Sequence, residues 1–181
     1  LRRQHELLTA RISQLEDMRA AVQLTMEARQ MGVNLTPDEM LEVFGDHDPT
    51  QYAEEAERRW GDADVYRDSR RRTSRYGKEK WLAIRDEGEE IERRLAAAFA
   101  AGAPSHSEAA MQAAEAHRQH ISRWFYDCSH ELHRGLGDLY LQDRRFTAHY
   151  DERAPGLAAY VRDAIHANAE RAEPPPASSS P

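Results

Sequence analysis

Residues 123–133 hold the densest group of side chains that could bind or react, and they read Arg-Trp-Phe-Tyr-Asp-Cys-Ser-His-Glu-Leu-His. We expect this segment to lie on a helix that runs past Cys128. Three successive aromatic side chains on a helix cannot all face one core, so at least one should border a groove or a partner. Aromatic walls with a few polar tips suit a small-molecule pocket, although core packing is the plainer interpretation for any single ring.

Histidine spacing offers a second chemistry, because His117/His120 and His130/His133 are i,i+3 pairs near Cys128. Histidine and cysteine are the usual zinc ligands. The spacing matches no named zinc motif, however, and such pairs also arise by chance in a chain with 9 histidines. No histidine is marked out as a haem ligand either. We therefore expect neither a metal site nor a cofactor.

Nucleophilic catalysis is the third chemistry to weigh. Cys128 and His130 are two residues apart, and side chains at that spacing on a helix do not face each other. The chain contains no glycine-rich phosphate loop, no nucleophile elbow and no paired-carboxylate motif. We expect a binding protein rather than an enzyme. As the only cysteine, Cys128 excludes an internal disulfide, fits a reducing compartment, and is expected to be a buried structural thiol.

Capping signals predict most of the helices that must position these residues. Residues 36–39 read Thr-Pro-Asp-Glu, which combines an N-cap, a proline at the first helical position and a capping-box glutamate. Asp48, Asp62 and Asp143 can cap further helices, and Pro155 can begin the last one. The predicted helices cover approximately residues 37–44, 49–60, 63–75, 78–101, 106–128 and beyond, 144–150 and 156–169. Gly135 and Gly137 weaken helix continuity without ending it, and no strand-like alternation occurs, so we predict an all-α fold.

A heptad repeat marks the first 30 residues. Leu1, Leu8, Leu15 and Val22 recur every seven residues, and the other seam position holds His5, Ile12, Arg19 and Met26. This narrow stripe favours a dimerising coiled coil over residues 1–30, with an ordinary amphipathic helix as the alternative. Because the pattern is already running at Leu1, we expect a preceding segment.

The rest divides into two parts. Residues 31–172 form the predicted binding domain, in which residues 32–76 are short-helical and highly charged, and are expected to be marginally stable without a ligand. The proline- and serine-rich residues 173–181 are expected to be a disordered tail.

Charge and hydropathy limit the partners. The net charge is −7, which disfavours direct DNA binding because DNA is a dense polyanion. Acidic residues interleave the basic run Arg70–Arg72, so a solvated helix face is favoured over a nucleic-acid patch. No apolar run approaches the roughly 20 residues needed to cross a bilayer, and no signal peptide is present. We expect a cytoplasmic protein without membrane contact.

Several long strings resemble the drug-recognition domain of TipA-type transcription regulators. They are EARQMGVNLTP at residues 27–37, EVFGD at 42–46, RWG at 59–61, YDC at 126–128, PGLAAY at 155–160 and RDAIHANA at 162–169. The resemblance covers nearly the whole chain. Residues 1–30 are similar to the dimerisation helix that follows the winged-helix DNA-binding domain in the MerR family.

The resemblance implies a globin-like helical domain that binds thiopeptide antibiotics or similar apolar macrocycles. It further implies a homodimer through residues 1–30, DNA contact only through an N-terminal domain outside this sequence, and RNA polymerase as a further partner. In the implied mechanism, the macrocycle docks on an aromatic groove and residues 32–76 fold over it, which biases the DNA-binding half.

One departure from the family pattern concerns covalent capture. In the members that trap thiopeptides, a second cysteine seven residues after Tyr-Asp-Cys captures a dehydroalanine of the drug. This chain has Gly135 at that position, and Cys128 matches the first cysteine instead. Cys128 could substitute only if it were exposed with a lowered pKa. We therefore expect reversible binding.

The predicted ligand-binding residues are Trp60, Tyr66, Trp81, Trp124, Tyr126, Cys128, His133, Gly135, Tyr140, Phe146 and Tyr150. Two alternatives to an antibiotic sensor remain. The chain could sense several drugs or another small molecule without thiopeptide specificity, or it could be a plain helical dimeric module for protein interaction.

Overall fold

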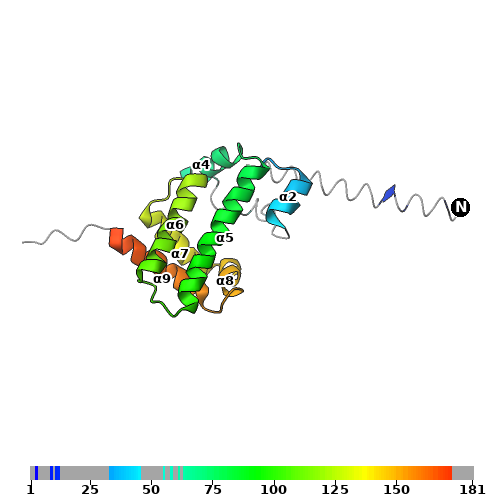
Figure 1. Ribbon diagram of the computed structural model, residues 1–181. Coiled ribbons are helices and arrows are strands. Elements are labelled where there is room, and N and C mark those ends of the chain that lie inside the picture. The colour runs from blue at the N-terminus through cyan, green and yellow to red at the C-terminus, as the bar shows by residue number, and fades with distance from the viewer. Residues whose placement is uncertain are drawn as a thin grey trace, which may run out of the picture. The chain divides into compact units, whose positions relative to one another are not determined.

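The computed structural model describes residues 33–45, 61 and 63–172, together with the isolated residues 3, 9, 11, 12, 55 and 58. Every regular element in this part of the chain is an α-helix, which confirms the predicted all-α fold. Figure 1 shows these helices in chain order. The chain divides into two compact units, Leu1–Ala83 and Ile84–Pro181.

In the first unit lie α2 (Pro37–Phe44), α4 (Asp64–Thr73) and the start of α5 (Lys78–Ala100). The capping box predicted for α2 is confirmed: Thr36 Oγ accepts from the Glu39 N–H at 3.3 Å, and Glu39 Oε2 accepts from the Thr36 N–H at 2.8 Å. The Trp81 ring packs edge-on against Phe44, with ring centroids 5.5 Å apart, and against Tyr76 at 5.8 Å. Among the described residues of this unit, the buried apolar ones are Val33, Leu35, Met40, Val43 and Trp81.

The start of α4 differs from the prediction. Ala63 is the N-cap residue and makes no side-chain cap, whereas Asp62 was expected to cap this helix. Asp64 lies in the first turn instead, where its negative charge interacts favourably with the positive end of the helix dipole. In the following basic run, Arg71 and Arg72 both pair with Asp68, in agreement with a solvated helix face.

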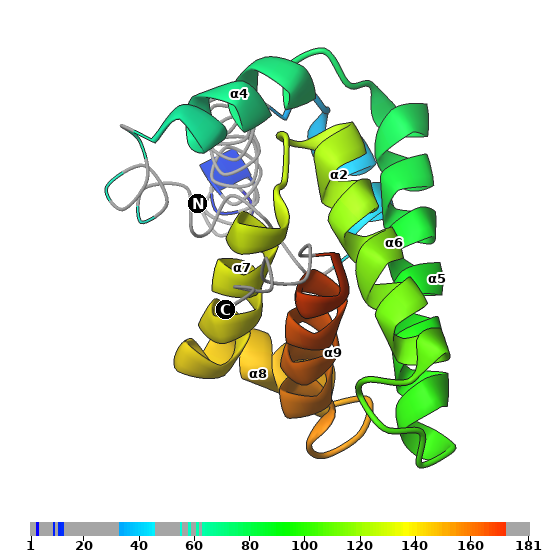
Figure 2. The ribbon, with the colours of Figure 1, turned by 90° about the vertical axis from the view of Figure 1, so that its left-hand side faces the viewer.

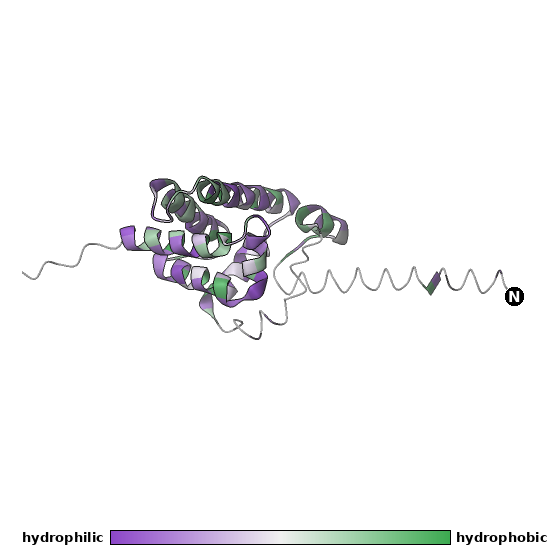
Figure 3. Ribbon diagram, turned by 90° about the horizontal axis from the view of Figure 1, so that it is seen from below, coloured by the Kyte–Doolittle hydropathy of each residue, from purple (hydrophilic) through white to green (hydrophobic). Residues whose placement is uncertain are grey.

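The second unit contains most of α5 together with α6 (Glu108–Trp124), α7 (His130–Gln142), α8 (Arg144–Asp151) and α9 (Leu157–Ala172). In Figure 2, α9 lies between α7 and α6, and it packs against both. The buried core cluster consists of Ile91, Leu95, Ala110, Ala113, Ala114, Tyr140, Tyr150, Leu157, Ala158, Val161, Ala164 and Ile165. Hydrophilic and hydrophobic bands recur along the helices that Figure 3 shows, as expected of amphipathic helices.

Small residues bring the helices of this unit close together. Three alanines of α6 in the core cluster have no exposed surface. On α7, a Cβ added at Gly137 would lie 3.4 Å from Ile165 Cδ1 and 3.5 Å from Arg162 Cα. Position 137 therefore faces α9 directly, with room for a Cβ at van der Waals distance but not for a larger side chain.

The helix predicted to run through Cys128 ends earlier. Helix α6 stops at Trp124 and α7 starts at His130, so residues 125–129 form a non-helical linker. Ser129 caps α7 by accepting from the Leu132 N–H at 3.1 Å. Aspartate, cysteine and serine are weak helix formers, and serine is a strong N-cap, which together explain the break. The predicted cap at Asp143 is confirmed, while α9 begins at Leu157 and extends to Ala172.

Several predictions lie outside the described residues. These are the heptad helix of residues 1–30, apart from Arg3, Thr9, Arg11 and Ile12, which are helical; the helix of residues 49–60, apart from the helical Glu55 and Arg58; and the tail of residues 173–181. Among the helices that are described, none is long and apolar enough to cross a membrane.

Candidate functional site

The predicted site residues fall in different parts of the chain. Trp60 lies outside the described residues. Tyr66 and Trp81 belong to the first unit, where Trp81 is buried. The second unit holds Trp124, Tyr126, Cys128, His133, Gly135, Tyr140, Phe146 and Tyr150.

Tyr140 is the centre of the aromatic group in the second unit. Its ring centroid lies 5.3 Å from that of Tyr150, 5.7 Å from Phe146 and 6.1 Å from His117. Tyr140 and Tyr150 are buried in the core, and burial raises the pKa of both hydroxyls. They can therefore support a binding surface from beneath, whereas Phe146 is exposed on α8.

Two histidines meet inside the bundle in a pairing that the sequence did not indicate. His117 Nδ1 on α6 lies 2.8 Å from His133 Nε2 on α7, so the contact joins helices rather than i,i+3 neighbours. His133 has no exposed surface. Burial lowers the pKa of His117 to about 4 and that of His133 to about 3. Both rings are therefore neutral at pH 7, with one donating and the other accepting.

The proton on this pair can be assigned from the partners. His133 Nδ1 is buried and has no hydrogen-bond partner among the described residues. A buried N–H without an acceptor costs more than an unused acceptor. We infer that His133 Nε2–H donates to His117 Nδ1. In the part of the chain that the structure describes, no group of three or more His, Cys, Asp or Glu residues could hold a metal ion.

Cys128 lies in the linker with its thiol inside the fold. It is 2% exposed, its sulfur lies 3.7 Å from the Ser129 carbonyl oxygen, and burial raises the thiol pKa to about 11. The thiolate is the nucleophilic form of cysteine. Cys128 therefore meets neither condition for reactivity, because it is buried and stays protonated at neutral pH.

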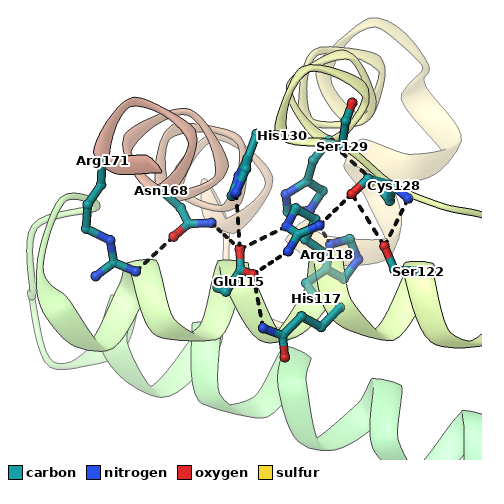
Figure 4. A network of polar contacts seen from close by, with 11 residues as sticks. Glu115, His117, Arg118, Ser122, Cys128, Ser129, His130, Asn168 and Arg171 are labelled. Carbon is teal, nitrogen blue, oxygen red and sulfur yellow. Dashed lines mark hydrogen bonds and ion pairs between the residues drawn. The ribbon is translucent and has the colours of Figure 1, made fainter. Parts of the chain in front are cut away.

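The backbone of Cys128 is held by α6 in an arrangement that the sequence analysis missed. Its N–H donates to Ser122 Oγ at 2.9 Å, and its carbonyl accepts from Arg118 Nη1 at 2.6 Å (Figure 4). Arg118 also pairs with Glu115 at 2.6 Å. In the sequence this pair looks like any i,i+3 surface ion pair, so nothing marks its contact with the linker.

A partly exposed apolar stripe runs along α7. Leu132, Gly135, Leu136 and Leu139 have i, i+3, i+4, i+7 spacing, which places them along one side of the helix. Leu132 is 41% exposed. Gly135 is exposed, and a Cβ added there would meet no described side chain within 4 Å. This stripe offers a ligand apolar surface and a position where it can approach the backbone.

The aromatic residues before α7 are fixed to different degrees. Trp124 Nε1 donates to Glu87 Oε2 of α5 at 2.7 Å, so this indole is tethered at the end of α6. Tyr126 lies in the linker and is half-buried, and burial raises its pKa to about 12. The linker therefore places one amphipathic aromatic side chain shortly before the apolar stripe.

Comparisons with known proteins agree with this architecture. A family model, the TipAS antibiotic-recognition domain, matches residues 52–168. The chain is 58% identical over 174 residues to the HTH-type transcriptional activator TipA of Streptomyces coelicolor, covering 96% of this chain and 69% of the relative. It is 31% identical over 171 residues to the HTH-type transcriptional activator mta of Bacillus subtilis, covering 91% and 65%.

A solved structure supplies the three-dimensional comparison. It is the complex of nosiheptide with TipAS from Streptomyces lividans, which matches with a TM-score of 0.73 and 55% sequence identity and covers 78% of this chain and 99% of that one. The family model covers α4 to α8 and most of α9, and the match to TipA of Streptomyces coelicolor extends over 174 residues. The chain belongs to the TipAS antibiotic-recognition domain family.

Proposed function

We propose that this chain is the effector-sensing part of a drug-responsive transcriptional activator and that it binds a thiopeptide antibiotic or a similar apolar macrocycle. The observation that carries the proposal is the likeness to nosiheptide-bound TipAS, at 55% identity and a TM-score of 0.73. A role in binding rather than catalysis is supported by the relatives, which are transcriptional regulators, and by the buried, protonated thiol of Cys128.

The ligand surface in the second unit is proposed to include Tyr126, Gly135 and Phe146, next to the leucines of the α7 stripe. Burying apolar surface stabilises a complex by about 25 cal/mol per Å² before the costs of ordering are subtracted. Behind this surface, Cys128, His133, Tyr140 and Tyr150 belong to the core and keep α7 in place. The proposed contacts made by Trp60, Tyr66, Trp81 and Trp124 remain predictions.

Binding is proposed to be reversible. A covalent bond to a dehydroalanine would form when a thiolate adds across the alkene and the α-carbon takes up a proton, so a thiol must reach the ligand. Position 135 has no side chain, and the Cys128 thiol is buried. Neither position therefore offers a thiolate to the ligand.

The wider assembly is also part of the proposal. A homodimer through residues 1–30 is supported by the heptad and by Ile12, a seam residue that is 56% exposed. DNA, and RNA polymerase as a partner of an activator, would be reached through a DNA-binding domain beyond this sequence, in the cytoplasm. Ligand binding is proposed to stabilise the short-helical segment of residues 32–76 and so bias that domain.

The test is thermal unfolding of the chain with nosiheptide, together with mass spectrometry. A ligand at a hundred times its Kd stabilises the folded state by about 2.7 kcal/mol, which corresponds to a Tm increase of roughly 5–10 °C for a chain of this size. We expect this increase, a rise in helicity, and no mass adduct after denaturation.

Gly135→Cys is the matched variant for the reversible mode. It places an exposed thiol on the α7 stripe, so denatured protein should gain the whole mass of the ligand. An adduct on the unmodified chain that disappears in Cys128→Ala would show that Cys128 traps the ligand after all. If no thiopeptide shifts the Tm but unrelated drugs do, the chain is a different small-molecule sensor. If no ligand shifts the Tm, a protein-interaction module becomes the better explanation.

A further inference from the structure

Two side chains of α6 hold the linker between α6 and α7 at Cys128, one on each of the two peptide groups that flank its Cα. The Cys128 N–H donates to Ser122 Oγ at 2.9 Å, and the Cys128 carbonyl accepts from Arg118 Nη1 at 2.6 Å. Ser122 and Arg118 are four residues apart on α6 and therefore lie on the same side of that helix. Two side chains of one helix thus fix the backbone where the chain turns towards α7.

Arg118 is itself held rigidly. Its Nε and Nη2 donate to the two oxygens of Glu115 at 3.0 and 2.6 Å, a two-point arrangement that fixes the plane of the guanidinium. Glu115 also accepts from Asn168 Nδ2 of α9 at 2.8 Å, and Asn168 is 2% exposed. Figure 4 shows the resulting chain of contacts from α9 through Glu115 and Arg118 to the linker.

The place of these two Cys128 contacts in the chain determines which residues they orient. Ser129, directly after Cys128, is the N-cap of α7, so fixing the Cys128 peptide fixes the first turn of that helix. Leu132 and Gly135 follow within the next two turns. On the N-terminal side of Cys128, Tyr126 is two residues away. The orientation of Tyr126 and of the α7 stripe therefore depends on the guanidinium contact of Arg118 together with the hydrogen bond to Ser122.

We propose that Arg118 is a positioning residue for ligand recognition, which holds the linker and the start of α7 in the binding-competent arrangement without touching the ligand. This inference rests on the proposed function. Lysine cannot replace Arg118. An ammonium group is a compact charge, and it lacks the planar guanidinium that makes two hydrogen bonds to Glu115 and a third to the Cys128 carbonyl.

Arg171 provides a matched control at the far end of the same network. Its Nη2 donates to Asn168 Oδ1 at 2.9 Å and its Nη1 pairs with Glu108 at 3.0 Å, so it joins α9 to α6 without contact to the linker. Arg171→Lys makes the same chemical change as Arg118→Lys. A loss that reflects only weakened packing of α9 on α6 would appear in both variants.

The experiment measures nosiheptide affinity by calorimetry, Tm, and NMR hydrogen exchange of the Cys128 and Leu132 amides in the full chain. Arg118→Lys should weaken nosiheptide binding at least tenfold and raise exchange at both amides at least tenfold without ligand. Arg171→Lys should leave nosiheptide affinity and linker exchange within twofold of the unmodified chain, even if its Tm falls as much as that of Arg118→Lys. If Arg118→Lys does not fold, Ser122→Ala should show the same loss of affinity and the same faster exchange, relative to Arg171→Lys.

Two results overturn the proposal. Equal affinity losses in the two lysine variants would reduce Arg118 to a packing role. Unchanged exchange at Cys128 and Leu132 in Arg118→Lys would show that the guanidinium does not hold the linker. Failure of the unmodified chain to bind nosiheptide would instead refute the proposed function, and with it the recognition role, while the exchange measurement would still decide whether Arg118 positions the linker.

Discussion

His117 and His133 share a hydrogen bond in the interior of the second unit, far from each other in sequence. The sequence pointed to the pairs His117/His120 and His130/His133 because spacing along one helix was the only geometry it offered. The observed pair depends on which sides of α6 and α7 meet, and this is set by the linker of residues 125–129. Burial rather than spacing then determines the charge of the pair.

The pair predicts that the fold is acid-labile. Both histidines have pKa values in the folded state, about 4 and about 3, that lie below the value near 6.5 of an unfolded chain. The unfolded state therefore binds more protons below pH 6.5, and stability falls as the pH decreases from there. We expect a loss on the order of 5 kcal/mol between pH 7 and 4.5, measured by urea unfolding.

Among the other titrating groups, one histidine adds to this effect, whereas Glu115 and His149 differ from it in pH range or in sign. His120, whose pKa is also lowered by burial, adds to the loss. Glu115, with a pKa of about 2, loses its contribution only below about pH 4.5. His149 has a raised pKa through its bond to Glu92, so its stabilisation is complete below pH 6.5 and is lost as the pH rises. His133→Gln should reduce the acid slope, and an unchanged slope would contradict the assignment.

At the scale of the element, α7 carries two glycines in contrasting surroundings. Gly135 is exposed with open space around it, whereas Gly137 faces Ile165 of α9 at van der Waals distance. The sequence indicated correctly that neither glycine ends the helix. It could not show which one matters for packing, because that depends on the side of α7 that α9 covers.

The two glycines predict opposite effects on stability. Gly135→Ala should increase the free energy of unfolding by about 0.5–1 kcal/mol, because alanine favours the helix and meets nothing. Gly137→Val should decrease it by about 2 kcal/mol or more, because the added methyl groups have no room beside Ile165 and Arg162. Denaturant titration of both variants checks this, and a stabilising Gly137→Val would show that α7 and α9 do not pack as described.

The capping signals in the sequence predicted some helix boundaries correctly and missed others. The capping box at Thr36 and the cap at Asp143 were readable because side chain and helix start are adjacent in sequence. The linker of residues 125–129 had a comparable signal in Ser129, followed by Glu131 in the first turn of α7. That signal was outweighed by the long helical pattern on both sides of it. No local sequence pattern indicates the contact from Arg118 to the Cys128 carbonyl, which lies ten residues further along the chain.

At the scale of the whole molecule, each unit has its own buried residues. The core cluster of the second unit lies entirely between Ile91 and Ile165. In the described part of the first unit, the buried apolar residues extend from Val33 to Trp81. Composition and helical pattern were sufficient to predict an all-helical molecule and to set residues 32–76 apart as short-helical. They could not place a boundary between Ala83 and Ile84, inside α5, because that boundary depends on contacts between residues distant in sequence.

The division predicts that residues 78–172, produced alone, fold into a helical domain with cooperative thermal unfolding. The fragment keeps the whole core cluster and all of α5, so no buried face of α6, α7, α8 or α9 loses its partner within the second unit. Circular dichroism and calorimetry should give one transition with equal van't Hoff and calorimetric enthalpies. A fragment that is unfolded or melts without cooperativity would contradict the independence of this core.

The missing side chain at Gly135 also has a consequence in time. A receptor that bonds covalently to its signal records every encounter and is reset only by new synthesis of the protein. A chain that holds the proposed drug by surface contact alone loses it when the surrounding concentration falls, at a rate set by dissociation. Such a receptor reports the present dose rather than the accumulated exposure, and its output ends within the residence time of the drug.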